Sequence, residues 1–113
     1  MKLSIDQILT LTTGRLYTKN GIAGVYETLD GLLNEKLMTH HLPVANDFCK
    51  PQVEAQLPVE LLVIVSNWNH SEDWQKRICE IQDLFGSIDI IIDKTGFEDY
   101  MIDNSLLIKK VTA

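Results

Sequence analysis

Apolar residues recur at helical spacing through the first half of the chain. Starting at Ile22, they fall at intervals of three and four positions, which predicts an amphipathic helix reaching Leu33. An earlier helix is predicted where Ser4 and Gln7 fit a capping box and Gly14 suits a helix end. The N-terminal half is therefore expected to be helical.

A third helix is predicted at the end of a connector at residues 37–43. Pro43 suits the first turn of that helix, where a missing backbone N–H costs nothing. Pro51 is expected to end or restart it, because an internal proline removes a helical hydrogen bond. Pro58 closes this part of the chain.

The pattern changes in the second half, where short β-branched runs predict buried strands. We expect strands at residues 61–65, 88–93 and 105–111, with a helix over 71–85 between the first two. The predicted fold class is α+β: a helical N-terminal half (about 1–58) packed on a small β-α-β-β sheet (about 59–113). At 113 residues the chain is expected to form a single domain, 1–113. If the halves share one core, ten residues should be buried: Val25, Leu29, Leu33, Phe48, Val63, Ile64, Ile78, Ile81, Ile90 and Ile92.

Charge separates the second half from the first. The chain carries a net charge of −6, and residues 71–103 hold nine acidic residues against three basic ones. Such a surface attracts basic partners and repels nucleic acid. The only basic pairs are residues 76–77 and 109–110, so direct DNA or RNA binding is not expected.

Composition excludes several other classes of protein. The chain is 45% hydrophobic and 23% charged, as in ordinary globular proteins. It has no run of 18 apolar residues and no apolar leader, so we expect a cytoplasmic protein that does not cross a membrane. Cys49 and Cys79 are predicted to be buried thiols rather than a disulfide. We expect no zinc site, no other metal and no cofactor.

Three weak patterns suggest ligand chemistry. His40 and His41 are adjacent, and imidazole titrates near neutrality, but neighbouring residues point apart, and a hydrogen bond from one His to a backbone carbonyl is the simpler role. Trp68 and Asn69 follow the first predicted strand, where open sheets often bind ligands. Arg15 follows a small polar segment that suits an anion. A structural ion pair with an acid such as Glu27 or Asp30 is the simpler role for Arg15.

A row of carboxylates suggests a protein-binding face. In the predicted second strand Asp89 and Asp93 point to one side. With Glu98, Asp99 and Asp103 they would form an acidic face that meets a basic partner. Large side chains near this stretch are the candidate anchors, because a few buried anchors supply most binding energy: Trp68, Phe97 and Tyr100.

Three segments of the first half resemble a known group of proteins: Ile8–Leu16, Tyr26–Leu29 and Thr39–Ala45. Their Thr-Gly-Arg-Leu and Thr-His-X-Leu-Pro patterns resemble a family of small uncharacterised proteins of tailed bacteriophages and prophages, over roughly residues 4–58. In that family an arginine often follows the proline, whereas Val44 stands here. The resemblance implies phage origin and no established activity, so no catalytic residue is carried over.

The sequence leaves two main functions open. The first is a non-enzymatic counter-defence inhibitor, anti-CRISPR-like, that occupies the basic surface of a host nuclease or CRISPR effector subunit. The alternative is a small-ligand or nucleotide-sequestering protein whose pocket uses Arg15, His40, His41, Trp68 and Asn69. A histidine-dependent hydrolase is a third hypothesis. A homodimer through the predicted edge strand at 105–111 is also considered.

Overall fold

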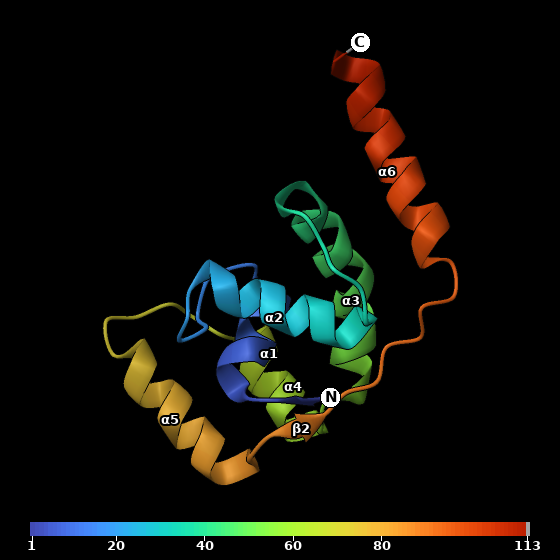
Figure 1. Ribbon diagram of the computed structural model, residues 1–113. Coiled ribbons are helices and arrows are strands. Elements are labelled where there is room, and N and C mark those ends of the chain that lie inside the picture. Colours follow the sequence, from blue (N-terminus) through green and yellow to red (C-terminus); the bar gives the residue numbers. More distant parts are fainter. Residues whose placement is uncertain (113) are drawn as a thin grey trace.

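The protein is mainly helical (Figure 1). The computed structural model describes the backbone of residues 1–112 and the side chains of residues 1–104. The elements in chain order are β1 (Lys2–Leu3), α1 (Ile5–Thr13), α2 (Ile22–Leu33), the 3-10 helix η1 (Thr39–His41), α3 (Leu42–Gln56), α4 (Val59–Ser66), α5 (Trp74–Phe85), β2 (Ile88–Asp89) and α6 (Phe97–Thr112). Within the described backbone the only sheet is the antiparallel pair β1–β2, so the predicted α+β fold with a β-α-β-β sheet is wrong.

Helix α1 begins and ends as its sequence predicts. The side chain of Gln7 accepts a hydrogen bond of 2.9 Å from the backbone N–H of Ser4, which is one half of a capping box. Gly14 ends the helix with a φ of 75°, and its N–H reaches the carbonyl oxygen of Thr10 at 3.1 Å. Only glycine adopts this left-handed conformation at little cost.

Helix α2 also matches its prediction, and one of its glycines has a packing role. A Cβ added at Gly24 would lie 2.6 Å from the side chain of Thr18, closer than real atoms approach. Glycine therefore lets the loop before α2 lie against the helix.

Helix α3 continues through Pro51, so the prediction that this proline ends or restarts the helix is wrong. An internal proline costs roughly 3 kcal/mol. Cys49 and Val53 lie on either side of it, and both side chains are fully buried. Their burial opposes that cost and keeps the helix intact.

The predicted strand at residues 61–65 is wrong as well, because these residues belong to α4. The buried positions are Leu61 and Val65, four residues apart, whereas Val63 between them is 55% exposed. That spacing is helical. A run of five apolar residues is too short for its period to separate a helix from a strand.

The predicted strand at 88–93 shrinks to β2, in which Asp89 lies opposite Lys2 and Ile88 opposite Leu3. The predicted third strand at 105–111 lies within the backbone of α6, which removes the edge strand proposed for a homodimer. We call residues 90–104 the arm: a segment that leaves β2, runs along α3 and enters α6. Figure 1 shows α6 extending away from the other helices.

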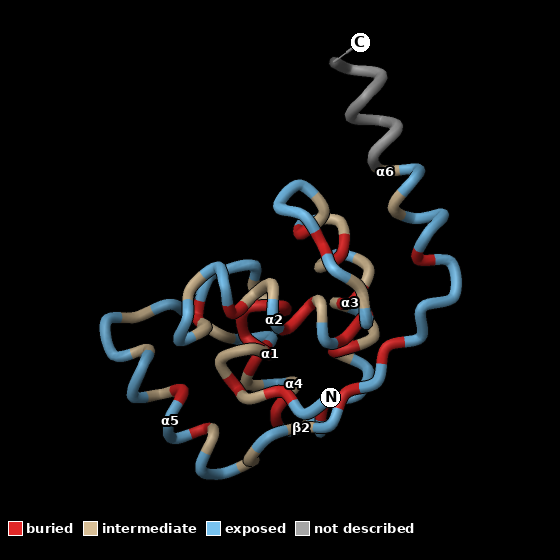
Figure 2. Tube along the Cα trace, in the orientation of Figure 1, coloured by how far each residue is buried: buried red, intermediate tan, exposed pale blue. Residues whose placement is uncertain are grey.

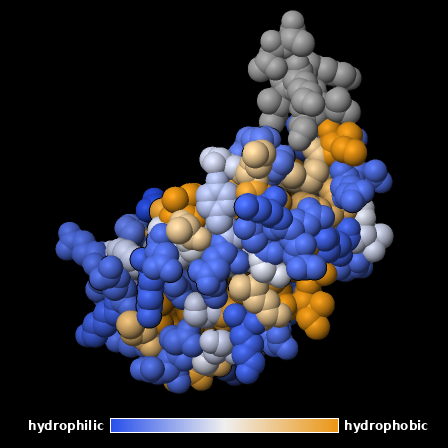
Figure 3. Space-filling view, viewed as in Figure 1, coloured by the Kyte–Doolittle hydropathy of each residue, from blue (hydrophilic) through white to orange (hydrophobic). Residues whose placement is uncertain are grey.

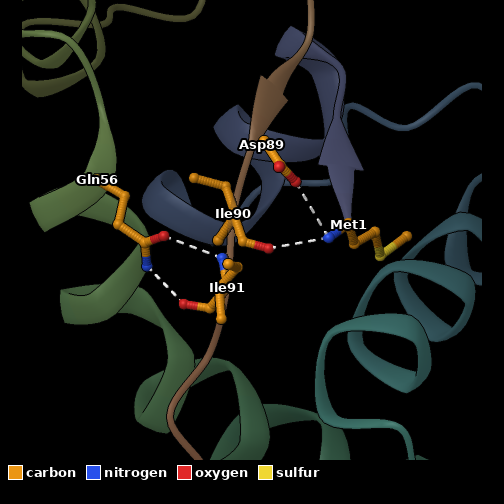
Figure 4. A network of polar contacts seen from close by, with 5 residues as sticks. All are labelled: Met1, Gln56, Asp89, Ile90 and Ile91. Carbon is orange, nitrogen blue, oxygen red and sulfur yellow. Dashed lines mark hydrogen bonds and ion pairs between the residues drawn. The ribbon is translucent and has the colours of Figure 1, made fainter.

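Two glutamines of α3 bind the arm by its peptide groups. The side chain of Gln56 donates to the carbonyl oxygen of Ile91 at 2.7 Å and accepts from its N–H at 2.9 Å (Figure 4). Gln52 makes the same pair of bonds to Asp93, at 3.0 and 2.7 Å. On the other side, Met1 and Ile90 exchange hydrogen bonds of 3.0 and 2.8 Å.

A single cluster of buried side chains includes residues from α1 through α6. Figure 2 shows buried positions concentrated around α1 and α3, and mostly exposed ones along α6. Six of the ten expected core residues are buried: Leu29, Leu33, Ile78, Ile81, Ile90 and Ile92. Val25, Phe48 and Ile64 are half-buried, and Val63 is exposed because α4 turns it outward.

Candidate functional site

Aromatic side chains from three segments meet at Tyr17. The indole N–H of Trp68 donates to the hydroxyl of Tyr17 at 2.9 Å, and Nδ1 of His70 lies 3.0 Å from the same oxygen. The ring of Trp74 packs edge-on against Tyr17, with a centroid distance of 5.2 Å. Tyr17 itself is buried. This cluster fixes the loop between α4 and α5 to the loop that follows α1.

One face of Trp68 is already covered by this chain. The guanidinium of Arg77 lies 4.4 Å from the centre of the indole ring, within the range of a cation–π contact. Arg77 also donates to the backbone oxygen of Asn69 at 3.2 Å. Trp68, predicted as a ligand-binding or anchor residue, thus stacks on an arginine of its own chain.

A groove of about 490 Å³ lies beside the aromatic cluster, and we call it the α1–α5 groove. The positions that α5 contributes recur at three- and four-residue spacing, so a single face of this helix forms one wall. The other wall comes from the start of α1 and from residues 17–19. The residues lining the groove are Ser4, Asp6, Tyr17, Thr18, Lys19, Trp74, Gln75, Ile78, Cys79, Gln82 and Asp83.

The two cysteines differ, and the expectation that both are buried holds for only one. Cys49 is buried, and this burial raises the pKa of its thiol to about 11. Cys79 is exposed and lines the α1–α5 groove. Both are free thiols, as expected.

The contacts made by the residues predicted to line a small-ligand pocket do not bring them together in one place. The rings of His40 and His41 do not point apart: their centroids lie 4.0 Å from one another, with a tilt of 56° between the planes. Nδ1 of His41 accepts a hydrogen bond of 3.2 Å from the backbone N–H of Met38, so its backbone partner is an N–H and not the expected carbonyl. Arg15 is exposed, and its backbone N–H donates to Oγ1 of Thr13 at 3.2 Å. Figure 1 places η1 and the loop between α4 and α5 at separate parts of the molecule.

The expected ion pair of Arg15 with Glu27 or Asp30 is also absent from the described residues. Asp30 instead accepts a hydrogen bond of 3.0 Å from the backbone N–H of Leu37. Within residues 1–104 no group of three His, Cys, Asp or Glu side chains has the geometry to hold a metal.

All nine acidic side chains of residues 71–103 are exposed. Of these nine, only Asp89 forms an ion pair with a described residue, at 3.3 Å with the N-terminal ammonium. The hydroxyl of Thr95, followed by its backbone N–H, lowers the pKa of Asp93, and the Ser71 hydroxyl lowers that of Asp73. The carboxylates of Asp73 and Asp93 are therefore charged at neutral pH, and all nine side chains are open to a partner.

The candidate anchors lie in different settings. Phe97 is only 2% exposed and packs on Phe48 with a centroid distance of 5.0 Å, so in this structure it attaches α6 to α3. Tyr100 follows on α6, is 36% exposed and lies 5.6 Å from Phe48. Tyr100 is thus the aromatic side chain of the arm that a partner can reach.

Sequence reasoning missed Tyr17, Trp74, Gln52 and Gln56. Trp74 falls at the start of the helix predicted over residues 71–85, where its spacing indicates only an inward-facing position, and Tyr17 follows the Gly-Arg-Leu segment without any periodic signal. The only hint for the glutamines is their spacing of four residues, which places both on one face of a helix.

Residues 3–59 match the profile of a family described as a domain of unknown function (DUF7736). The chain belongs to this family. The matched residues cover β1 through α3, close to the span of the phage-protein resemblance, and the family is an uncharacterised one as that resemblance implied. No curated protein and no solved structure matches the chain. The described part of the chain contains no helix with the length and apolar character needed to cross a bilayer.

Proposed function

We propose that this protein is a binding module, not an enzyme, that recognises a basic surface on a protein partner. The observation that carries the proposal is the set of nine exposed carboxylates at residues 71–103, of which only Asp89 is paired within the described chain. Unpaired carboxylates attract a basic partner over a distance and raise its association rate.

The arm and the residue before it are the part of this surface best suited to a partner. Asp89, Asp93, Glu98, Asp99 and Asp103 are all exposed on it. Tyr100 is partly exposed among them, and aromatic side chains are frequent anchors in interfaces. Since α6 extends away from the other helices, a partner can approach it without displacing the core (Figure 1).

The finer form of the proposal is a phage counter-defence inhibitor acting in the cytoplasm of a host bacterium. Its support is the resemblance of the first half to phage proteins together with the acidic surface. Nucleases and CRISPR effectors hold phosphates in basic channels, which an acidic protein can occupy. The nucleotide-binding and hydrolase alternatives rely on His40 and His41, whose contacts are with each other and with Met38.

Affinity capture from a bacterial lysate tests the proposal. The tagged full chain is expected to retain a basic protein that elutes at high salt, because exposed charge pairs are screened. Reversing two charges on α6, with Glu98→Lys and Asp99→Lys, is expected to abolish capture.

The matched control places the same two charge changes away from the arm. Glu27→Lys on α2 and Glu60→Lys on α4 alter exposed residues and change net charge equally. Capture that survives the arm variant, or fails equally in both variants, contradicts recognition through the arm. A bound small molecule without a protein partner contradicts the proposal as a whole.

A further inference from the structure

The α1–α5 groove has two chemically different ends. At one end Tyr17 and Trp74 pack edge-on, and Lys19, two residues after Tyr17, also lines the groove. At the other end the start of α1 meets the last turn of α5, where the backbone N–H of Ile5 donates to Oε1 of Gln82 at 2.8 Å. Nine residues of helix separate Trp74 from Asp83, a rise of about 13 Å.

Two carboxylates line the second end. Asp6 comes from the first turn of α1, where its side chain accepts a hydrogen bond from the hydroxyl of Ser4, and Asp83 comes from α5. Asp83 is exposed and forms no hydrogen bond or ion pair with the described residues. A carboxylate has about four acceptor positions, so both groups retain acceptors for a ligand.

We propose that the α1–α5 groove binds an arginine side chain of the basic partner, a proposal that rests on the proposed function. Its guanidinium lies at the Asp6–Asp83 end, where planar N–H groups and carboxylates match. Its aliphatic part lies along Ile78, and the neighbouring part of the partner contacts Trp74. The same fold already stacks the guanidinium of Arg77 on an indole, at Trp68.

Acetylated, amidated tetra-arginine is the probe, titrated into the isotopically labelled full chain and followed by amide chemical shifts. The expected shifts concentrate at Trp74, Ile78 and Asp83. Asp83→Asn is expected to weaken binding about fivefold, the scale of one charge-assisted contact at a partly exposed site. Glu80→Gln is the matched control, because Glu80 is exposed on the same helix but does not line the groove.

The effect of Lys19→Ala shows whether the groove binds a cation or an anion. If the ligand is a cation, Lys19→Ala removes a like charge and tightens binding of tetra-arginine. If Lys19→Ala weakens binding, or if tetra-glutamate binds better than tetra-arginine, the groove takes an anion and the proposal is overturned. Equal losses for Asp83→Asn and Glu80→Gln overturn it too, since they indicate general attraction to α5.

Capture from a lysate with two variants distinguishes this proposal from the proposed function. Suppose that Asp83→Asn and the unaltered chain capture the lysate partner equally, and that the Glu98→Lys, Asp99→Lys variant loses it. The groove proposal is then overturned, and recognition through the acidic arm stands. Asp83→Asn is expected to leave the melting temperature unchanged, because this side chain makes no contact that supports the fold. A lower melting temperature would assign Asp83 to stability and overturn the proposal.

Discussion

The helices of the N-terminal region and the arm at residues 90–104 are attached to the protein in different ways. In α1 and α2, apolar side chains such as Ile8, Leu9 and Leu29 are fully buried at helical spacing. The arm buries only Ile90, Ile92 and Phe97 among its described residues, and bonds between glutamine side chains and peptide groups supply much of its remaining attachment. A segment held by few buried side chains opens locally at a lower cost than a packed helix. The arm is therefore the part that can be altered while the rest stays folded.

The largest expected effect is in the packed region. Leu29→Ala removes a fully buried side chain from α2, so we expect the free energy of unfolding to fall by about 2–5 kcal/mol. Urea unfolding followed by circular dichroism measures this. Ile22→Ala on the same helix changes an exposed residue and should have a far smaller effect. Equal effects would contradict the assigned core.

A smaller and more local effect is expected at the arm. Phe97→Ala removes the buried ring that contacts Phe48, so α6 should detach while α1, α2 and α3 remain folded. Amide hydrogen exchange should rise over residues 97–104 and stay unchanged in α1. Ile102→Ala, at a side chain of the same helix that is 55% exposed, is the control. A global loss of protection would show that the arm and the N-terminal helices unfold together.

The smallest effect is expected at the glutamines. Gln56→Glu keeps an acceptor for the N–H of Ile91 but loses the donor to its carbonyl oxygen, costing about 0.5–1.5 kcal/mol at neutral pH. Protonation of the new carboxyl restores a donor, so folding raises its pKa above the usual value of about 4.3. The attachment is then full below that value and is lost as pH rises through the raised pKa.

Hydrogen exchange of residues 90–93 at several pH values measures this dependence. Gln75→Glu, at an exposed position without a hydrogen bond among the described residues, is the matched control. If both variants show the same pH profile, the glutamine bonds do not hold the arm.

The sequence predicted α1, α2 and the start of α3 because their apolar spacing and caps are local signals. The errors at the two predicted strands that are helical share one physical cause: residues 61–65 and 105–111 are short apolar runs, and such runs suit a strand or a buried helix equally. Pro51 was misjudged because the burial of Cys49 and Val53 is a tertiary effect. Likewise, no local pattern reveals that Tyr17 meets Trp74 or that Gln56 reaches Ile91.

One face of the molecule offers partners little apolar area in any one place. The face in Figure 3 is mostly hydrophilic, with small separate hydrophobic patches. Recognition on this face is therefore expected to depend on charge and a few anchors, which agrees with the proposed function.

The paired glutamines of α3 hydrogen-bond to the arm in the way that the edge strand of a sheet bonds to a neighbouring strand. Two residues four apart on a helix are separated by about 6 Å along its axis, and two alternate residues of an extended chain by about 6.6 Å. The side-chain amides of Gln52 and Gln56 thus repeat at nearly the interval of strand peptide groups, and they meet Asp93 and Ile91. These hydrogen bonds are made to peptide groups, so they do not depend on the identity of the arm's side chains. The outward side chain at position 91, which is 73% exposed, is consequently free to change in evolution without loosening the arm, whereas that of Asp93 also accepts a hydrogen bond of 2.9 Å from the backbone N–H of Thr95.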